Sequence, residues 1–83
     1  MTPFDIIKRL YDIHLCIKQE NTGTPDEFAK KFHLSRRQLY NIIEELKDYG
    51  AVIEYSRIRQ TFFYVNDFDI TINQLHFSFS KEK

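Results

Sequence analysis

The 83-residue sequence contains one cysteine, two glycines and two prolines, and it has no long apolar run. The lone Cys16 excludes a disulfide within the chain, which is typical of proteins from a reducing compartment. No segment approaches the roughly 20 apolar residues that span a membrane, and no signal-peptide pattern opens the sequence. We therefore expect a cytoplasmic protein with no membrane contact.

Residues that commonly bind metals or perform catalysis are few and scattered. His14 and Cys16 are two positions apart on a predicted helix and so point to different faces, while His33 and His76 have no neighbouring ligand. Neither glycine belongs to a phosphate-binding loop, and adjacent acidic residues diverge on helices. The sequence thus predicts no enzymatic activity, no metal, no cofactor and no small-molecule substrate, and each histidine is expected to be structural.

Positive charge is not in excess over the whole chain. Lys and Arg number 12, as do Asp and Glu, so the formal net charge is zero. Residues 30–59, however, hold seven basic and four acidic side chains, a local net charge of +3, and the remaining residues carry −3. Because nucleic-acid-binding domains usually present a basic face, any DNA contact is expected within residues 30–59.

Three segments begin with a helix-capping pattern. Thr2 and Thr24 each precede a proline at the first helical position, and Ser35 opens the third segment. Thr24 and Ser35 are followed three residues later by Glu27 and Gln38, the pairing of a capping box. The expected helices run over residues 3–18, from 25 to a turn at 33–34, and over 36–49, where Gly50 ends the third.

Apolar residues at helical spacing predict which faces pack into the core. These are Ile6, Ile7, Leu10, Ile13, His14 and Ile17 of the first helix, Phe28, Ala29 and Phe32 of the second, and Leu39, Ile42, Ile43, Leu46 and Tyr49 of the third. Most of the eight Phe and five Tyr also fall on core faces. Tyr40, Phe62 and Tyr64 remain candidates for stacking on a nucleic acid.

After Gly50 the apolar period changes from helical to alternating. Residues 51–56 alternate, and Phe63 and Val65 resume the alternation after residues 57–60. This pattern predicts a two-stranded hairpin. Its turn lacks Gly, Asn and Asp, so we expect a loop longer than two residues.

Residues 67–83 form a C-terminal extension with a second alternating pattern. Its apolar residues are Phe68, Ile70, Ile72, Leu75, Phe77 and Phe79. The parity changes at Asn73-Gln74, which predicts two short strands, because β-branched and aromatic residues favour strands over a helix. The extension either exposes an apolar stripe that forms a homodimer or folds back on the first helix of a monomer.

The order of these elements predicts the fold. A short helix, a tight turn and a longer helix form a helix-turn-helix, and the hairpin that follows forms a wing. The fold class is therefore α+β, a winged helix-turn-helix over residues 1–66 with an apolar β extension over residues 67–83. No effector domain follows in this sequence, so we expect the DNA-binding module alone.

Two short segments carry a family resemblance. Ser35–Tyr40 reads Ser-Arg-Arg-x-aliphatic-Tyr, and Gly50–Tyr55 contains a Gly followed by Ile-Glu-Tyr. With these segments, about half the chain is similar to the N-terminal domain of DeoR-like and WYL-domain bacterial transcriptional regulators. The resemblance implies sequence-specific binding to double-stranded DNA by a small regulator whose third helix enters the major groove.

The candidate DNA contacts lie on the polar side of the third helix. Arg37, Tyr40 and Asn41 share this side, with Arg36 at its flank and Ser35 at the cap. Arginine can pair with guanine and asparagine with adenine. The resemblance assigns DNA contact to the first four matching positions, 35, 36, 37 and 40, whereas Asn41 stands where the family often has a basic residue. A merely solvated helix face would show the same pattern.

Two further candidates flank the wing tip. Arg57 and Arg59 are placed to reach backbone phosphates or the minor groove, although a solvated turn would also contain them. The acids Glu44, Glu45 and Asp48 would repel phosphates, so only the first two turns of the third helix are expected in the groove.

A second function remains open. The neutral net charge and the acidic C-terminal half of the third helix also suit a winged helix that acts as a protein–protein interaction adaptor without binding DNA.

Overall fold

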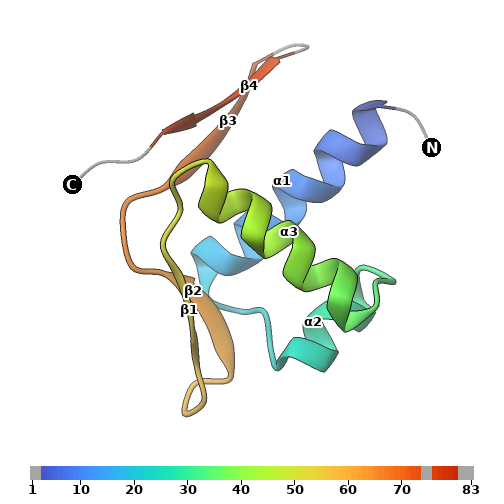
Figure 1. The fold of residues 1–83 in the computed structure, drawn as a ribbon, viewed down its shortest axis with the longest axis vertical. Helices are drawn as coiled ribbons and strands as arrows, with labels where there is room; N and C mark the ends of the chain where they lie inside the picture. Colours follow the sequence, from blue (N-terminus) through green and yellow to red (C-terminus); the bar gives the residue numbers. More distant parts are fainter. Residues whose placement is uncertain (1–2, 74–75, 81–83) are drawn as a thin grey trace.

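The computed structural model describes the backbone of residues 3–73 and 76–80 and the side chains of residues 5–70. Within these residues the elements are α1 (Pro3–Gln19), α2 (Pro25–Lys31), α3 (Arg36–Asp48), β1 (Ile53–Ser56), β2 (Thr61–Tyr64), β3 (Asp69–Asn73) and β4 (His76–Ser80). Strands β1 and β2 form one antiparallel hairpin, the wing, and β3 and β4 form another. The predicted winged helix is confirmed: three helices precede the wing (Figure 1).

Two of the predicted helix caps are present in full. The Thr24 hydroxyl accepts the Glu27 amide at 3.2 Å, and the Glu27 carboxylate accepts the Thr24 amide at 2.9 Å, which also lowers the pKa of Glu27. At the third helix, the Ser35 hydroxyl accepts the Gln38 amide at 3.1 Å, and the Gln38 side-chain oxygen accepts the Ser35 amide at 2.9 Å. These bonds satisfy amides that have no partner inside the helix. The predicted cap at Thr2 lies outside the described residues.

All three helices end in the same way. A residue in the left-handed region follows each helix: Glu20 (φ 57°), His33 (φ 57°) and Gly50 (φ 111°). The next amide then donates to a carbonyl five residues earlier, at 3.1, 2.8 and 3.1 Å respectively, which is the Schellman motif. The second of these motifs is the tight turn of the helix-turn-helix, so His33 sets the direction in which the chain enters α3.

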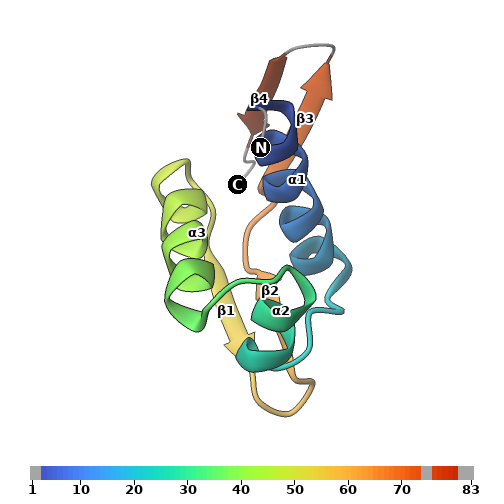
Figure 2. The same cartoon turned by 90° about the vertical axis from the view of Figure 1, so that its right-hand side faces the viewer.

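The core lies between the C-terminal half of α1, the inner faces of α2 and α3, and the wing. Its buried apolar residues are Ile13, Ile17, Phe28, Ala29, Leu39, Ile43, Leu46, Ala51, Ile53, Phe62, Phe68 and Ile70. The burial of Phe68 and Ile70 shows that the beginning of the C-terminal extension packs on the same domain as α1. The extension then continues as the β3–β4 hairpin, at the end of the molecule opposite the wing tip (Figures 1 and 2).

Four sequence predictions about burial are wrong. Ile6 is 56% exposed because the core covers only the later turns of α1, and Tyr49 is 54% exposed because it caps α3 beyond the last core turn. Phe62 and Tyr64 do not offer stacking surfaces: Phe62 is buried and Tyr64 packs against the core. In both cases the register of β2 turns the ring inward, opposite Tyr55 and Ile53.

A buried pair of threonines attaches the wing to the helices. Thr22 follows α1 and Thr61 begins β2, and both are almost fully buried. The Thr22 amide donates to the Thr61 hydroxyl at 3.1 Å, and the Phe62 amide donates to the Thr22 hydroxyl at 2.9 Å. At the base of the wing, Asn66 accepts the Val52 amide and donates to the carbonyl of Gly50, closing the hairpin.

We expect Thr22→Val to destabilise the protein by about 1–3 kcal/mol, because it leaves the buried Phe62 amide without an acceptor. Urea unfolding followed by circular dichroism measures the change. As a control, Val65→Thr replaces a valine by threonine at an exposed position. It should lower the free energy of unfolding by less than about 0.5 kcal/mol. Equal stabilities of wild type and Thr22→Val would show that the threonine pair does not hold the wing.

Candidate nucleic-acid interface

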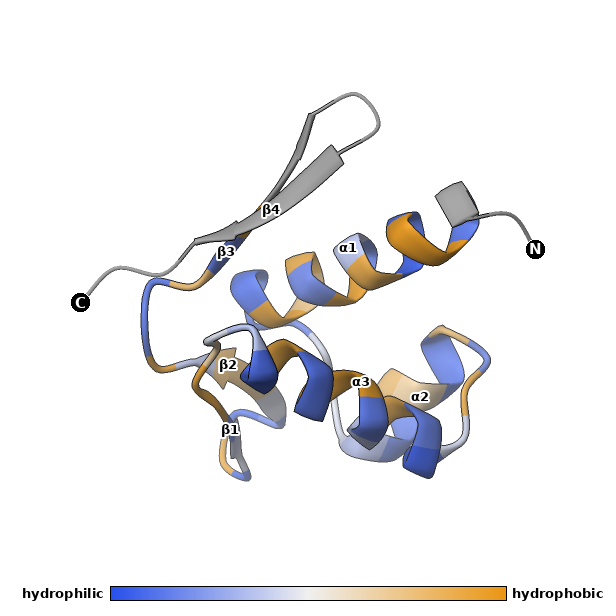
Figure 3. Ribbon diagram, turned by 45° about the horizontal axis from the view of Figure 1, so that its top comes forward, coloured by the Kyte–Doolittle hydropathy of each residue, from blue (hydrophilic) through white to orange (hydrophobic). Residues whose placement is uncertain are grey.

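The five predicted residues at the beginning of α3 form one exposed surface. Ser35, Arg36, Arg37, Tyr40 and Asn41 lie within the cap and the first two turns, all on the solvent side. Hydrophilic residues mark this outer side of α3 in Figure 3. The structure therefore brings these five together, and it leaves them accessible to a ligand.

The two arginines of the first turn differ in their surroundings. Arg36 Nε lies 3.3 Å from Asp26 Oδ1, and both side chains are more than half exposed. An exposed pair of this kind contributes at most about 1 kcal/mol, so a phosphate can replace the carboxylate. Arg37 forms no ion pair with any described residue. Arg37 is thus the cation at the beginning of α3 that is most directly available.

Ser35 and Tyr40 both have structural contacts as well. The Ser35 oxygen accepts the Gln38 amide, and its hydroxyl proton remains available for donation. The ring of Tyr40 meets that of Phe62 edge to face, with centroids 6.1 Å apart, and the residue is still 38% exposed. Tyr40 therefore connects the exposed side of α3 with strand β2. The 22-residue separation of the two rings gives no local signal from which this contact could be predicted.

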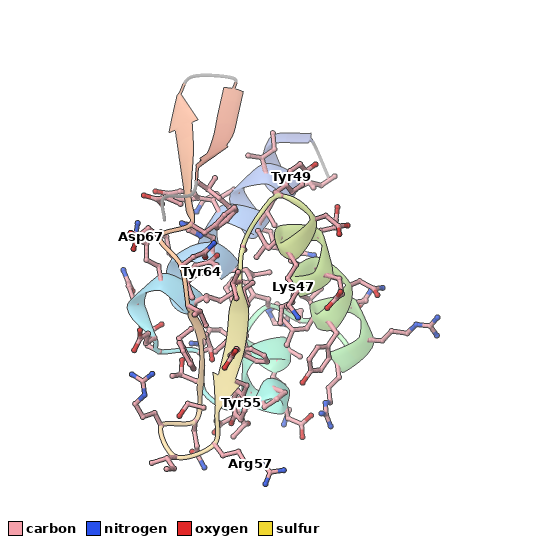
Figure 4. All side chains as sticks on the ribbon, turned by 60° about the vertical axis from the view of Figure 1, so that its left-hand side comes forward. Lys47, Tyr49, Tyr55, Arg57, Tyr64 and Asp67 are labelled. Atoms are coloured by element: carbon pink, nitrogen blue, oxygen red, sulfur yellow. The ribbon has the colours of Figure 1, made fainter. Side chains whose placement is uncertain are left out.

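The two wing arginines also lie in different environments. Arg57 is exposed at the end of the wing (Figure 4) and has no ionic partner in the part of the chain that the structure describes. Arg59 turns back toward the body: its guanidinium pairs with Glu20 at the end of α1 and lies 5.2 Å from the centroid of the Phe63 ring. The sequence pattern indicates both arginines but not their acid partners Asp26 and Glu20, because no motif marks these acids.

The acidic half of α3 remains exposed. Glu44, Glu45 and Asp48 all face solvent, and Lys47 pairs with Glu44 at 3.3 Å. The positive part of α3 is therefore limited to its N-terminal turns.

His14 belongs to a buried polar cluster rather than to a binding site. Its Nε2 lies 3.0 Å from Asp69 Oδ1, and its Nδ1 lies 2.7 Å from the Tyr64 hydroxyl. Lys18 Nζ, 2.7 Å from the other oxygen of Asp69, helps to lower the pKa of that carboxyl. An ionised carboxylate only accepts, so Nε2 donates to Asp69 and Nδ1 accepts the Tyr64 proton. The cluster joins α1 to the wing and to the beginning of β3.

The described residues contain no group of three or more His, Cys, Asp or Glu side chains that could hold a metal ion. Burial raises the pKa of the Cys16 thiol, so it stays protonated, as expected for a packing residue. Of the helices that the structure describes, none is both long and apolar enough to cross a membrane.

The family comparison agrees with this geometry. The model of the HTH domain family matches residues 9–59, from α1 to the wing tip and more than half of the chain, and the chain belongs to this family. Membership indicates DNA binding by a helix-turn-helix regulator, a class that is typically not enzymatic. No curated protein and no solved structure matches the chain.

We expect acidification from about pH 7 to about pH 5 to destabilise the protein through His14. Burial lowers the pKa of His14 below its ordinary value of 6.5, against the opposing effect of Asp69. The unfolded chain therefore takes up this proton at a higher pH than the folded one, and stability falls as the pH drops through 6.5 toward the folded pKa. The lowered pKa of Asp69 adds a separate loss only in stronger acid, below its ordinary value of 3.8.

Urea unfolding of wild type and His14→Gln at the two pH values tests this expectation. The free energy of unfolding should fall less for the variant, which cannot titrate at this position. An NMR titration of the His14 ring in the wild-type protein gives the same information without a variant. Identical pH dependence in both proteins, or a His14 pKa at or above 6.5, would contradict the assignment.

Proposed function

We propose that this protein is a small transcriptional regulator that binds double-stranded DNA sequence-specifically, with the first two turns of α3 in the major groove. The observation that carries the proposal is the charge at the helix starts. The first turns of α1 and α2 contain acids, Asp5 in one and Asp26 and Glu27 in the other, as the helix dipole favours. The first turn of α3 contains no acid but has Arg36 and Arg37.

Two cations at the positive end of a helix dipole are unfavourable for the helix itself, by roughly 0.3–1 kcal/mol each at exposed positions. Residues that destabilise the helix in which they lie are commonly found at functional sites. A polyanion in contact with this end of α3 would reverse the sign of the effect, because both the arginines and the helix-terminal amides attract phosphate. DNA contact would account for this arrangement, which supports the proposal.

The spacing of the exposed side chains fits a groove. Arg37 and Asn41 are four residues apart, so they lie one above the other on one side of α3. Arginine recognises guanine and asparagine recognises adenine through paired hydrogen bonds in the major groove. Ser35, Arg36 and Tyr40 would contact the sugar-phosphate backbone of the DNA beside these bases. The exposed acids further along α3 would keep its C-terminal half away from the phosphates.

The wing would supply a second contact. Arg57 is free to reach a phosphate or the minor groove, and Arg59 can do so by exchanging its exposed pairing with Glu20. The resemblance to DeoR-like and WYL-domain regulators further supports a bacterial, cytoplasmic protein.

We also propose a homodimer formed through residues 67–83. In the register of the second hairpin, the apolar pairs Ile70–Phe79 and Ile72–Phe77 alternate with polar pairs. Ile70 is already buried in the core, so contact with a second copy would involve the hairpin beyond it. Within the described residues β3 pairs only with β4, so each strand has an outer edge without a partner strand. Two linked modules would bind two half-sites about one helical turn apart and compensate for the small surface of each.

Arg37→Ala should weaken binding to a mixed-sequence duplex, because it removes the unpaired cation from the beginning of α3. If Arg37 contacts a phosphate, the slope of log affinity against log salt should decrease by about 0.9. Fluorescence anisotropy at several salt concentrations measures both quantities. The control Lys8→Ala removes one charge from an exposed position on α1, where Lys8 pairs with Asp12 outside the proposed interface. It should leave the affinity and the salt slope nearly unchanged.

Equal affinity and slope for Arg37→Ala and wild type would remove Arg37 from the interface. If the wild-type protein does not bind DNA at all up to about 10⁻⁴ M at low salt, the protein–protein adaptor becomes the better explanation, since DNA-binding proteins bind non-specifically at or below this concentration.

Light scattering after size exclusion tests the dimer. The full chain should have about twice the monomer mass of 10.1 kDa, and replacing Phe77 and Phe79 together by Ser should return it to the monomer. These substitutions are preferable to a truncation at Asp67, which would remove the core residues Phe68 and Ile70. A monomeric full chain would exclude the dimer.

A further inference from the structure

The wing tip, residues 57–60, presents an apolar side chain that the proposed contacts of α3 do not explain. Ile58 is 96% exposed, whereas the other large apolar residues exposed among the described side chains are 38–56% exposed. Turns of this kind usually contain Gly, Asn, Asp, Ser or Pro, each of which serves the turn conformation. Isoleucine contributes nothing to the turn and has no contact with the core.

The tip that carries Ile58 is held in place from several directions. The Ser56 hydroxyl accepts the Arg59 amide at 3.1 Å across the turn. Gln60 adopts a left-handed backbone (φ 53°), and the Thr61 that follows it is bonded to Thr22. In the free protein, Arg59 pairs with Glu20 and lies over the ring of Phe63, an exposed contact that restrains the tip until a phosphate replaces the carboxylate. Ile58 therefore projects from an ordered loop, so little conformational entropy is lost when it is buried by a partner.

The charges around Ile58 favour a polyanionic partner. Arg57 precedes it and has no ion pair in the described part of the chain, so its charge faces the same solvent. Two acids belong to this region: Glu20 at the end of α1 is paired with Arg59, and Glu54 is exposed on β1 opposite Phe63, farther along the wing from Ile58 than Arg57 is. A protein partner would require an interface of about 1,000 Å² or more, which a single isoleucine on a narrow tip does not provide. DNA requires much less apolar area, because one inserted side chain is enough to unstack a base step.

We propose that Ile58 is a wedge that enters the minor groove and partly unstacks a base step, while Arg57 contacts the phosphates beside it. This inference rests on the proposed DNA binding and adds a deformation of the duplex to it. Pyrimidine–purine steps such as TA are the easiest to unstack, so the wedge would favour sites with a TA or CA step under the wing. The wing would then contribute to sequence selection without a hydrogen bond to a base.

The test uses the full-length protein and a short duplex of repeated TA steps with 2-aminopurine in place of some adenines. The fluorescence of 2-aminopurine rises when it is unstacked, and anisotropy on the same duplex reports binding. Wild type at saturation should raise the fluorescence. Ile58→Ala should still bind but lose the rise, and Ile58→Leu should retain it. Val65→Ala, which shortens an exposed apolar residue at the base of the wing, should behave as wild type.

The outcomes separate this inference from the function on which it rests. Binding by wild type without a rise in fluorescence, or an undiminished rise with Ile58→Ala, would overturn the wedge and leave DNA binding intact. Absence of binding by wild type would overturn both. Circular dichroism of each variant confirms that the fold is unchanged, so a lost signal can be assigned to the side chain.

Discussion

The position of the wing depends on the buried contact between Thr22 and Thr61. A two-stranded hairpin is at best marginally stable alone in water, so β1 and β2 need the helical body to hold them. The threonines supply that attachment through hydrogen bonds in a site closed to water, where an unmade bond would be costly. Because Tyr40 packs on Phe62 next to this contact, the same attachment fixes the wing relative to α3.

Local charge, rather than net charge, decides how the chain can meet DNA. The protein is neutral overall, and two of its four candidate arginines are paired with acids of neighbouring elements. These pairs are exposed and therefore weak, so they restrain Arg36 and Arg59 without blocking them. They also reduce the electrostatic attraction between the free protein and any polyanion.

Much of the fold was predictable because its signals are local. The caps at Thr24 and Ser35, the helical spacing of apolar residues and the glycine after α3 each involve contacts within a few residues. Periodicity identified the inner face of each helix but not how far the neighbouring elements extend along it, which is why Ile6 and Tyr49 were wrongly placed in the core. The inward position of Phe62 depended on strand register, which the alternation alone did not determine.

The sequence was enough to predict which cations belong to the candidate site, but not which residues surround them. Ser35, Arg36 and Arg37 stand out beside a capping pattern, whereas the pairing of Arg36 with Asp26 and of Arg59 with Glu20 arises only when separate elements pack together. Likewise, no spacing rule connects His14 with Asp69, 55 residues away. Such contacts follow from tertiary structure, so they emerge only from coordinates.

The most direct test of the account is an NMR titration of nitrogen-15-labelled protein with duplex DNA, in which backbone amide shifts are followed residue by residue. We expect the largest shifts to occur together at residues 35–41 and at residues 57–59. Shifts confined to β3 and β4, or none at all, would contradict the claim that the beginning of α3 and the wing form one DNA-binding surface.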